Sequence, residues 1–133
     1  MPERDLALLT DAAREAGRIA LRFWRRDPKV WDKGGDHGPV TEADLAVNDM
    51  LKARLLAARP DYGWLSEETP DDAARLGCET VFIIDPIDGT RAFIMGSPLW
   101  GTLIGLLDNG KPCLGMMDQP FTGERFRSNG VQS

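Results

Sequence analysis

The N-terminal part of the sequence has the hydrophobic pattern of an amphipathic helix. Within residues 5–26, apolar residues recur at alternating spacings of three and four, on one helical face: Leu6, Leu9, Ala13, Ala16, Ala20 and Phe23. The Asp27-Pro28 pair predicts the end of this helix, because a proline disfavours the helical conformation in the residue before it. We interpret the helix as structural and Trp24 as a packing residue.

A second helix is expected over residues 41–58. The apolar residues on its inner side are Val47, Leu51 and Leu55. Its first residues, Thr41-x-x-Asp44, resemble a capping box, in which each of the two side chains accepts a hydrogen bond from the backbone N–H of the other residue. This structural role explains Asp44 without catalysis, and on these letters alone it is the favoured reading.

The remainder of the sequence predicts a largely antiparallel sheet. Short apolar runs bounded by turn residues are expected to be strands at 62–65, 81–84, 99–107, 111–117 and within 119–126. Asp108-Asn109-Gly110 predicts a hairpin turn, and Thr122-Gly123 predicts a turn before the last strand. Residues 71–77 are expected to form a loop or one helical turn and residues 91–95 a short helix. Residues 127–133 show no pattern.

The strand expected at 81–84 delivers two carboxylates. Its four consecutive bulky residues suit a strand covered on both faces, and Pro86 predicts its end because proline lacks a backbone donor. Asp85 and Asp88 then lie three positions apart in a tight turn, where both carboxylates and the carbonyl of Ile87 can face one point. Clustered hard oxygens of this kind suit Mg²⁺.

The residues that follow suit an anion. Gly89 would let the backbone approach a ligand, and the amides of Gly89 and Thr90 would hold a phosphate oxygen. The same letters also fit an ordinary surface turn. A site is favoured by the apolar strand that feeds the turn and by a second acidic pair, Glu67-Glu68, after the strand at 62–65. Because neighbouring strand residues point to opposite faces, only one of these glutamates is expected to face the site.

Composition restricts the class of partner. The chain has 133 residues, 42% of them hydrophobic, and a formal net charge of −5, which fits one globular domain. The negative charge argues against nucleic acid or an anionic membrane as a partner, and an anionic substrate would need metal ions to offset the repulsion. Cys78, Cys113 and His37 lack metal-ligand spacing, which argues against zinc or a disulfide framework. No signal peptide or long apolar segment is present, so a cytoplasmic location is expected.

Residues 33–39, with three glycines and a proline among charges, are expected to form a mobile loop that can act as a lid. His37 has no visible partner in the sequence, so a solvated role is favoured over a catalytic one. The favoured reading of Lys33 is an ordinary surface lysine. The alternative is that it reaches a metal-bound anion from the lid.

Three motifs in register resemble those of the inositol monophosphatase superfamily, the Mg²⁺-dependent, lithium-sensitive phosphomonoesterases. They are Val-Thr-Glu-Ala-Asp at 40–44, Ser-Glu-Glu-Thr at 66–69 and Asp-Pro-Ile-Asp-Gly-Thr at 85–90. Segments 91–103 and 118–126 are most similar to the histidinol-phosphate phosphatase branch. The resemblance implies an α/β fold, a layered α-β-α-β-α sandwich. This chain would form its first half, with two N-terminal helices on a largely antiparallel sheet.

The resemblance also implies which residues hold the metal ions. Glu67, Asp85 and the carbonyl of Ile87 would hold a first Mg²⁺. Asp85 and Asp88 would contribute to a second ion, and Glu67 would reach a third, loosely held one. Paired ions lower the pKa of a bound water and stabilise the attacking and leaving oxygens of an in-line displacement.

The same resemblance implies roles in water activation and phosphate binding. Asp44 and Thr90 would orient and deprotonate the attacking water. By this resemblance Asp44 has a catalytic role in addition to capping the helix. The amides of Gly89 and Thr90, together with Asp88, would hold the substrate phosphate. The leading substrate is histidinol phosphate, in histidine biosynthesis, with inositol phosphates and 3′-phosphoadenosine nucleotides as alternatives.

Family members are longer than this chain, and their later half supplies an aspartate in a Trp-Asp-x-Ala-type motif that completes the second metal site. The sequence lacks this motif, so residues 1–133 are expected to be the N-terminal, metal-binding half of the fold. Alone, this half is expected to hydrolyse phosphate esters very slowly or not at all, and an inactive fragment with residual metal binding is the alternative function. The open sheet edge near 119–126 favours self-association, and the family implies a homo-oligomer, commonly a dimer.

Overall fold

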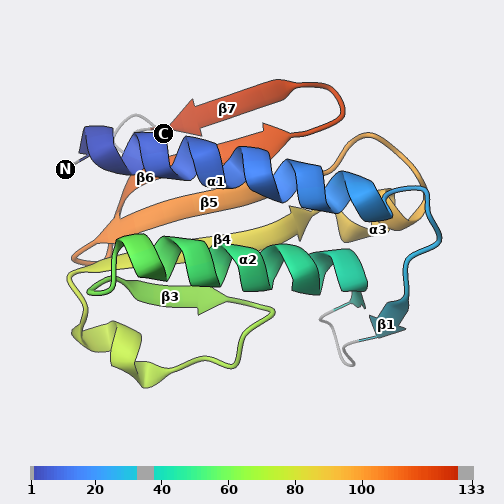
Figure 1. Cartoon of the computed structure of the whole chain (residues 1–133). Helices are drawn as coiled ribbons and strands as arrows, with labels where there is room; N and C mark the ends of the chain where they lie inside the picture. The colour runs from blue at the N-terminus through green and yellow to red at the C-terminus, as the bar shows by residue number, and fades with distance from the viewer. Residues whose placement is uncertain (1, 33–37, 129–133) are drawn as a thin grey trace.

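In the computed structural model, which describes residues 2–32 and 38–128, two helices lie on one face of a five-stranded sheet (Figure 1). The helices are α1 (Pro2–Phe23), α2 (Glu42–Ala58) and the short α3 (Thr90–Ile94), with a 3₁₀ helix, η1, at Ala73–Gly77. The strands of the sheet are β3 (Gly63–Ser66), β4 (Thr80–Asp88), β5 (Gly101–Asp108), β6 (Lys111–Gln119) and β7 (Glu124–Ser128). A separate antiparallel pair, β1 (Val30–Asp32) and β2 (Pro39–Thr41), precedes α2.

The sheet has the strand order β3-β4-β5-β6-β7. Strands β3 and β4 are parallel, and each of the other neighbouring pairs is antiparallel. Figure 1 shows α1 lying over β5 and β6, and α2 lying beside it in the opposite direction over β3 and β4. The expected α/β class, with two N-terminal helices on a largely antiparallel sheet, is therefore confirmed.

The core lies between these helices and one face of the sheet. Alternate residues of the central strands face the helices and are at most 3% exposed: Phe82, Ile84, Ile104, Leu106 and Met116. The helices cover them mainly with Leu9, Ala13, Ala16, Ala20, Val47, Leu51 and Leu55, all at most 1% exposed. These residues belong to the apolar faces that the sequence periodicity predicts, so the inner faces of α1 and α2 are confirmed.

Small residues let α1 approach the sheet closely. A Cβ atom on Gly17 would lie 3.0 Å from Cγ of Pro120, so a larger side chain would push the helix away. Trp24, which follows α1, packs as expected: its ring centroid lies 6.0 Å from that of Trp100 and 4.7 Å from that of Phe121. This aromatic cluster fixes the end of α1 against the turn between β6 and β7.

The opposite face of the sheet carries no helix in the part of the chain that the structure describes. We call it the open sheet face; cross-strand pairing places on it Leu65, Ile83, Leu103, Met117 and Phe126. Ile83 is half-buried, whereas Leu103 is 38% and Phe126 is 52% exposed. The expectation that residues 81–84 are covered on both faces holds only in part. The helices cover Phe82 and Ile84, whereas on the other face Val81 is 8% exposed and Ile83 is half-buried.

Several element ends differ from the sequence prediction. Helix α1 ends at Phe23, because Arg25 and Asp27 adopt left-handed backbone angles, with φ of 61° and 53°. Strand β7 extends to Arg127 and Ser128, which pair with β6, although the sequence shows no pattern from residue 127 onward. Strands β1 and β2 were not expected, because three residues are too few to show a periodic pattern.

Of the lid expected at residues 33–39, Gly38 and Pro39 are among the described residues. Lys33 and His37 lie outside the described residues. Within residues 2–32 and 38–128, no helix has the length and apolar character needed to cross a bilayer.

Candidate active site

The candidate site begins at a β-bulge in β4. On either side of the bulge Asp85 and Asp88 remain paired with β5, and two residues of β4 between them oppose Thr102 alone. The buried Thr102 hydroxyl donates a hydrogen bond of 2.9 Å to the carbonyl oxygen of Pro86. The prediction that Pro86 ends the strand is therefore wrong, because a bulge is a place where a missing backbone N–H does not interrupt the ladder.

Gly89 turns the chain from β4 into α3. Its φ of 89° lies in the left-handed region, which glycine adopts without steric cost. A Cβ atom at this position would also lie 3.1 Å from the carbonyl oxygen of Leu99. The sequence analysis assigned this glycine to close approach of a ligand, whereas the structure shows that the turn and the contact with Leu99 already require it.

Thr90 and Asp44 come together from different elements. Thr90 is the first residue of α3, and Asp44 lies in the first turn of α2, where it is 1% exposed. The Thr90 Oγ1 atom lies 3.1 Å from Oδ1 of Asp44 and 3.0 Å from the carbonyl oxygen of Ile87. The hydroxyl has one proton, so it donates to one of these two acceptors at a time.

The expected capping box is also present. Asp44 Oδ2 accepts hydrogen bonds from the backbone N–H of Thr41 at 2.8 Å and from its hydroxyl at 2.7 Å. In return, Thr41 Oγ1 accepts from the backbone N–H groups of Ala43 and Asp44. One oxygen of the Asp44 carboxylate thus caps α2 and the other reaches Thr90, so the capping explanation is correct but incomplete.

A pocket of about 230 Å³ lies beside these groups. It is lined by Pro39, Glu67, Glu68, Asp85, Ile87, Gly89, Thr90 and Arg91. Both glutamates line it, which corrects the expectation that only one faces the site. They lie in a turn after β3 and not on the strand, so the alternation of strand residues does not apply to them.

Two further results concern the lining of this pocket. Asp88 is exposed and is not among the lining residues, although it was expected at the metal. Pro39 and Arg91 line the pocket and were not selected from the sequence. The feature of the sequence that could have identified Arg91 as a pocket residue is its position directly after the motif at 85–90.

The carboxyl groups of the site repel one another. Burial raises the pKa of Asp85 to about 7, with further contributions from the nearby carboxyl groups of Asp88, Glu67 and Asp44. Asp88 also forms a hydrogen bond with Asp85, which raises the same pKa. This part of the molecule therefore concentrates negative charge around Asp85.

The donor set suits a hard divalent cation. Carboxylate oxygens and a backbone carbonyl are the ligands that Mg²⁺ prefers, and a cation would relieve the repulsion that raises the pKa of Asp85. Within the described ranges, no three ligand side chains converge closely enough to hold an ion. The residues present therefore fit Mg²⁺ by their chemistry, and side-chain rotation would have to bring their oxygens together.

A buried polar network supports the turn that carries Glu67. Asn48 of α2 accepts a hydrogen bond of 2.6 Å from the Ser66 hydroxyl and donates one of 2.9 Å to Thr69 Oγ1. The Trp64 indole N–H also donates to Thr69 at 3.2 Å. These bonds tie both ends of the turn to α2 and β3.

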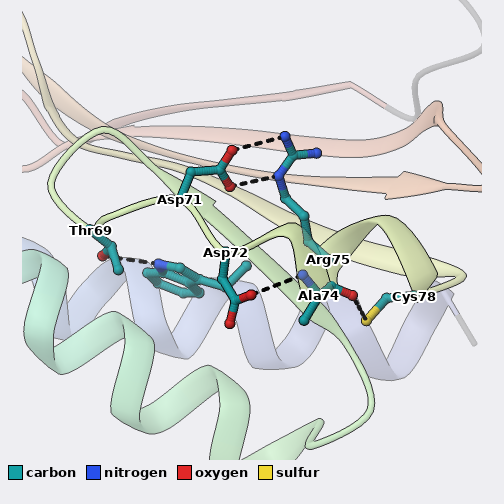
Figure 2. A network of polar contacts seen from close by, with 7 residues as sticks. Thr69, Asp71, Asp72, Ala74, Arg75 and Cys78 are labelled. Atoms are coloured by element: carbon teal, nitrogen blue, oxygen red, sulfur yellow. Dashed lines mark hydrogen bonds and ion pairs between the residues drawn. The ribbon is translucent and has the colours of Figure 1, made fainter.

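Figure 2 shows how the chain continues from this turn. The Arg75 guanidinium forms two hydrogen bonds with the Asp71 carboxylate, at 2.8 and 3.1 Å, and lowers the pKa of that exposed carboxyl group. The Asp72 side chain accepts a hydrogen bond from the backbone N–H of Ala74 and caps η1. Residues 71–77 were expected to form a loop or one helical turn, and the structure shows the helical turn, η1, between the glutamates and β4.

Comparison with known proteins places this fold and this acidic pocket in a family. The family model described as the inositol monophosphatase family matches residues 1–132. The chain therefore belongs to the inositol monophosphatase family. A histidinol-phosphatase from Chlorobaculum parvum is 38% identical over 125 residues, which cover 93% of this chain and 47% of that protein. The 3′(2′),5′-bisphosphate nucleotidase CysQ from Aggregatibacter actinomycetemcomitans is 34% identical over 131 residues, which cover 95% of this chain and 48% of that protein.

A solved structure extends the comparison to three dimensions. The extragenic suppressor protein suhB from Bartonella henselae matches with a TM-score of 0.87 and 29% identity, covering 96% of this chain and 50% of that one. The chain thus spans about half the length of these relatives. The family and fold that the three motifs indicated are confirmed.

Proposed function

We propose that this chain is the metal-binding and water-activating half of a Mg²⁺-dependent phosphomonoesterase that acts on a small polar metabolite. The observation that carries the proposal is the 3.1 Å contact between Thr90 Oγ1 and Asp44 Oδ1, beside a pocket lined by Glu67 and Asp85. A buried carboxylate behind a hydroxyl suits the acceptance of a proton from a water molecule in the pocket. Membership of the inositol monophosphatase family supports the same reaction.

Four residues would hold the metal ions. Glu67, Asp85 and the carbonyl oxygen of Ile87 would bind a first Mg²⁺, Asp85 and Asp88 would contribute to a second, and Glu67 would reach a third. When bound, the ions would lower the pKa of a water molecule and offset charge on the phosphoryl oxygens. The surroundings of Asp85 support this assignment, because its pKa is raised first by burial and then by the nearby carboxyl groups of Asp88, Glu67 and Asp44.

The protein's own part in the reaction is to orient the water and accept its proton. The Thr90 hydroxyl would accept the water proton while donating its own to Oδ1 of Asp44, at 3.1 Å. Thr41 holds the other carboxylate oxygen through two hydrogen bonds, so the acceptor has a fixed orientation. The amides of Gly89 and Thr90, with Asp88, would hold the phosphate group on the other side of the water.

Histidinol phosphate is the leading substrate, and its hydrolysis to histidinol and phosphate belongs to histidine biosynthesis. The similarity to the histidinol-phosphatase from Chlorobaculum parvum supports this choice. Inositol phosphates and 3′-phosphoadenosine nucleotides are the alternatives, and the similarity to CysQ favours the second. Phosphate release from the three compounds in millimolar Mg²⁺ would discriminate among them.

The metal site has a direct test by calorimetry. We expect the chain to bind Mg²⁺ and Asp85→Asn to remove most of that binding, because one shared carboxylate would contact both ions. Asp11→Asn is the matched control: it removes an equal charge at an exposed position on α1 and should leave the affinity unchanged. Absence of Mg²⁺ binding by the unaltered chain, or equal binding by the Asp85 variant, would contradict the site assignment.

An inactive fragment that binds metal is the second candidate function. The observation that favours it is the coverage of the relatives, about half of their length. We expect the purified chain to release phosphate from histidinol phosphate very slowly or not at all, because both ions must be clamped around the phosphoryl group. Turnover of about 1 to 10³ s⁻¹ would show that no further residues are required.

We further propose that the protein is cytoplasmic and forms a homo-oligomer, most simply a dimer.

A further inference from the structure

Arg91 lines the same pocket as the candidate catalytic groups. It follows Thr90 in α3, and the acidic residues around the pocket are Glu67, Glu68 and Asp85. Arg91 is the one basic residue among the described residues that line it. Its position inside an acidic pocket suggests a role in binding and not only in keeping the surface soluble.

The start of β2 holds this guanidinium at the edge of the pocket. A Cβ atom built on Gly38 would lie 3.3 Å from Nη1 and 3.4 Å from Nη2 of Arg91, so the guanidinium lies close to this glycine. Gly38 has a φ of 77°, a conformation in which a side chain is strained. Pro39, the next residue, also lines the pocket. The position of the Arg91 side chain therefore depends on a glycine at the pocket rim.

The Arg91 side chain has no ion-pair or hydrogen-bond partner among residues 2–32 and 38–128. Other arginines of the structure are paired: Arg59 with Asp5 at 2.9 Å and Arg75 with Asp71 at 2.8 Å. The five N–H donors of the Arg91 guanidinium are thus available to an anion that enters the pocket.

We propose that Arg91 is a substrate-binding residue that donates hydrogen bonds to the phosphoryl oxygens of the substrate; this inference rests on the proposed function. In an in-line displacement, water attacks from one side and the leaving group departs on the opposite side. Arg91 follows Thr90 and lines the same pocket, so its guanidinium is available to the oxygens of a phosphoryl group bound there.

Charge balance supports the same assignment. Two divalent ions offset four of the five carboxylates around the site, which are Asp44, Glu67, Glu68, Asp85 and Asp88. One carboxylate and the two negative charges of a phosphate dianion are left to be met by other groups. A guanidinium meets part of this charge, and its planar fork matches two phosphoryl oxygens at once. A lysine at the same position would supply the charge without the fork.

The test is the binding of inorganic phosphate in saturating Mg²⁺, measured by calorimetry or by ³¹P NMR. We expect Arg91→Gln to weaken phosphate affinity about tenfold, the usual effect of losing a charge-assisted hydrogen bond. Arg91→Lys should lie between this variant and the unaltered chain. Arg22→Gln is the matched control: it removes the same charge from an exposed position at the end of α1 and should change phosphate affinity less than about twofold.

Mg²⁺ titration without phosphate separates a binding role from a structural one. Removing a cation from the pocket rim should leave Mg²⁺ affinity unchanged or slightly raise it, whereas a collapsed site would lose it. Unchanged phosphate affinity in Arg91→Gln, with normal binding by the unaltered chain, would overturn this inference and leave the proposed function intact. Failure of the unaltered chain to bind phosphate in saturating Mg²⁺ would overturn both. If the glutamine variant does not fold, Arg91→Lys, which keeps the charge, provides the same comparison.

Discussion

The hydroxyl of Thr90 lies 3.1 Å from Oδ1 of Asp44, a residue 46 positions earlier in the sequence. This contact joins the first turn of α2 to the segment that follows β4. The same carboxylate caps α2 through its other oxygen, which accepts two hydrogen bonds from Thr41. One buried side chain thus serves both the start of a helix and the candidate site, and mutations can separate the two roles.

The first prediction separates capping from catalysis at Asp44. Thr41→Ala removes the capping partner and leaves the carboxylate, so it should cost about 1 kcal/mol of unfolding free energy with turnover largely retained. Asp44→Asn removes the proton acceptor and should lower kcat about 10²-fold or more. Melting temperature and kcat are measured in a full-length relative that carries the same residues. Normal kcat in the Asp44 variant would leave Asp44 with the capping role alone.

The second prediction concerns the pH dependence of stability. Burial and the nearby Asp88 raise the pKa of Asp85 from 3.8 to about 7, so between these values the folded state holds a proton that the unfolded state has released. The stability from this group is complete below about pH 4 and is lost as the pH rises through about 7. In metal-free buffer we therefore expect the contribution of Asp85 to lower the melting temperature between about pH 4 and pH 7.

Asp85→Asn tests this directly, because asparagine stays neutral at every pH. The variant should lose less stability over the same range and exceed the unaltered chain at about pH 8 by about 1 kcal/mol, a value reduced for the partial exposure of this side chain. Thermal unfolding with a chelator provides the measurement, and Asp11→Asn provides the control for net charge. Parallel pH curves for the Asp85 variant and the unaltered chain would contradict the assignment.

The third prediction concerns the network behind the glutamate turn. Asn48→Ala leaves the buried Ser66 hydroxyl without its 2.6 Å acceptor and removes the 2.9 Å donor to Thr69. We expect a loss of about 1–3 kcal/mol in unfolding free energy and a weaker Mg²⁺ affinity, because the turn carrying Glu67 loses its support. Asp49→Ala, at the neighbouring exposed position, should change neither quantity appreciably. A stability loss with unchanged Mg²⁺ affinity would show that the network does not position Glu67.

The fourth prediction concerns self-association through the open sheet face. Phe126 is 52% exposed on β7, where its cross-strand neighbour is Met117, and Leu103 follows on β5. Exposed apolar neighbours of this kind favour association, so Phe126→Ser should shift the chain toward the monomer in sedimentation velocity. Phe121→Ser changes an equally large residue, 55% exposed beside Trp24, and should have a smaller effect. The reverse order of the two variants would place the contact at the end of α1.

Much of the fold was predictable because its signals are local or periodic. The capping box depends on Thr41 and Asp44, three positions apart, and both of its bonds form as expected. The continuous apolar run at 81–84 identified a strand, although it did not show which of its residues face the helices. The course of β4 through Pro86 was not predictable, because the bulge depends on the pairing with β5 and on the bond from Thr102.

By itself the sequence determined which faces of α1 and α2 are buried and how α2 begins, since helical periodicity and short-range capping depend on neighbours in the chain. It also supplied the candidate residues for the chemistry, which stay predictions. Tertiary structure alone decided which of those residues meet. The contact between Asp44 and Thr90, the entry of both Glu67 and Glu68 into one pocket and the position of Arg91 beside them all require α2, β3 and α3 to pack around the end of β4. Residues so far apart in sequence become neighbours only when apolar faces are buried together, and the spacing of letters does not encode that geometry.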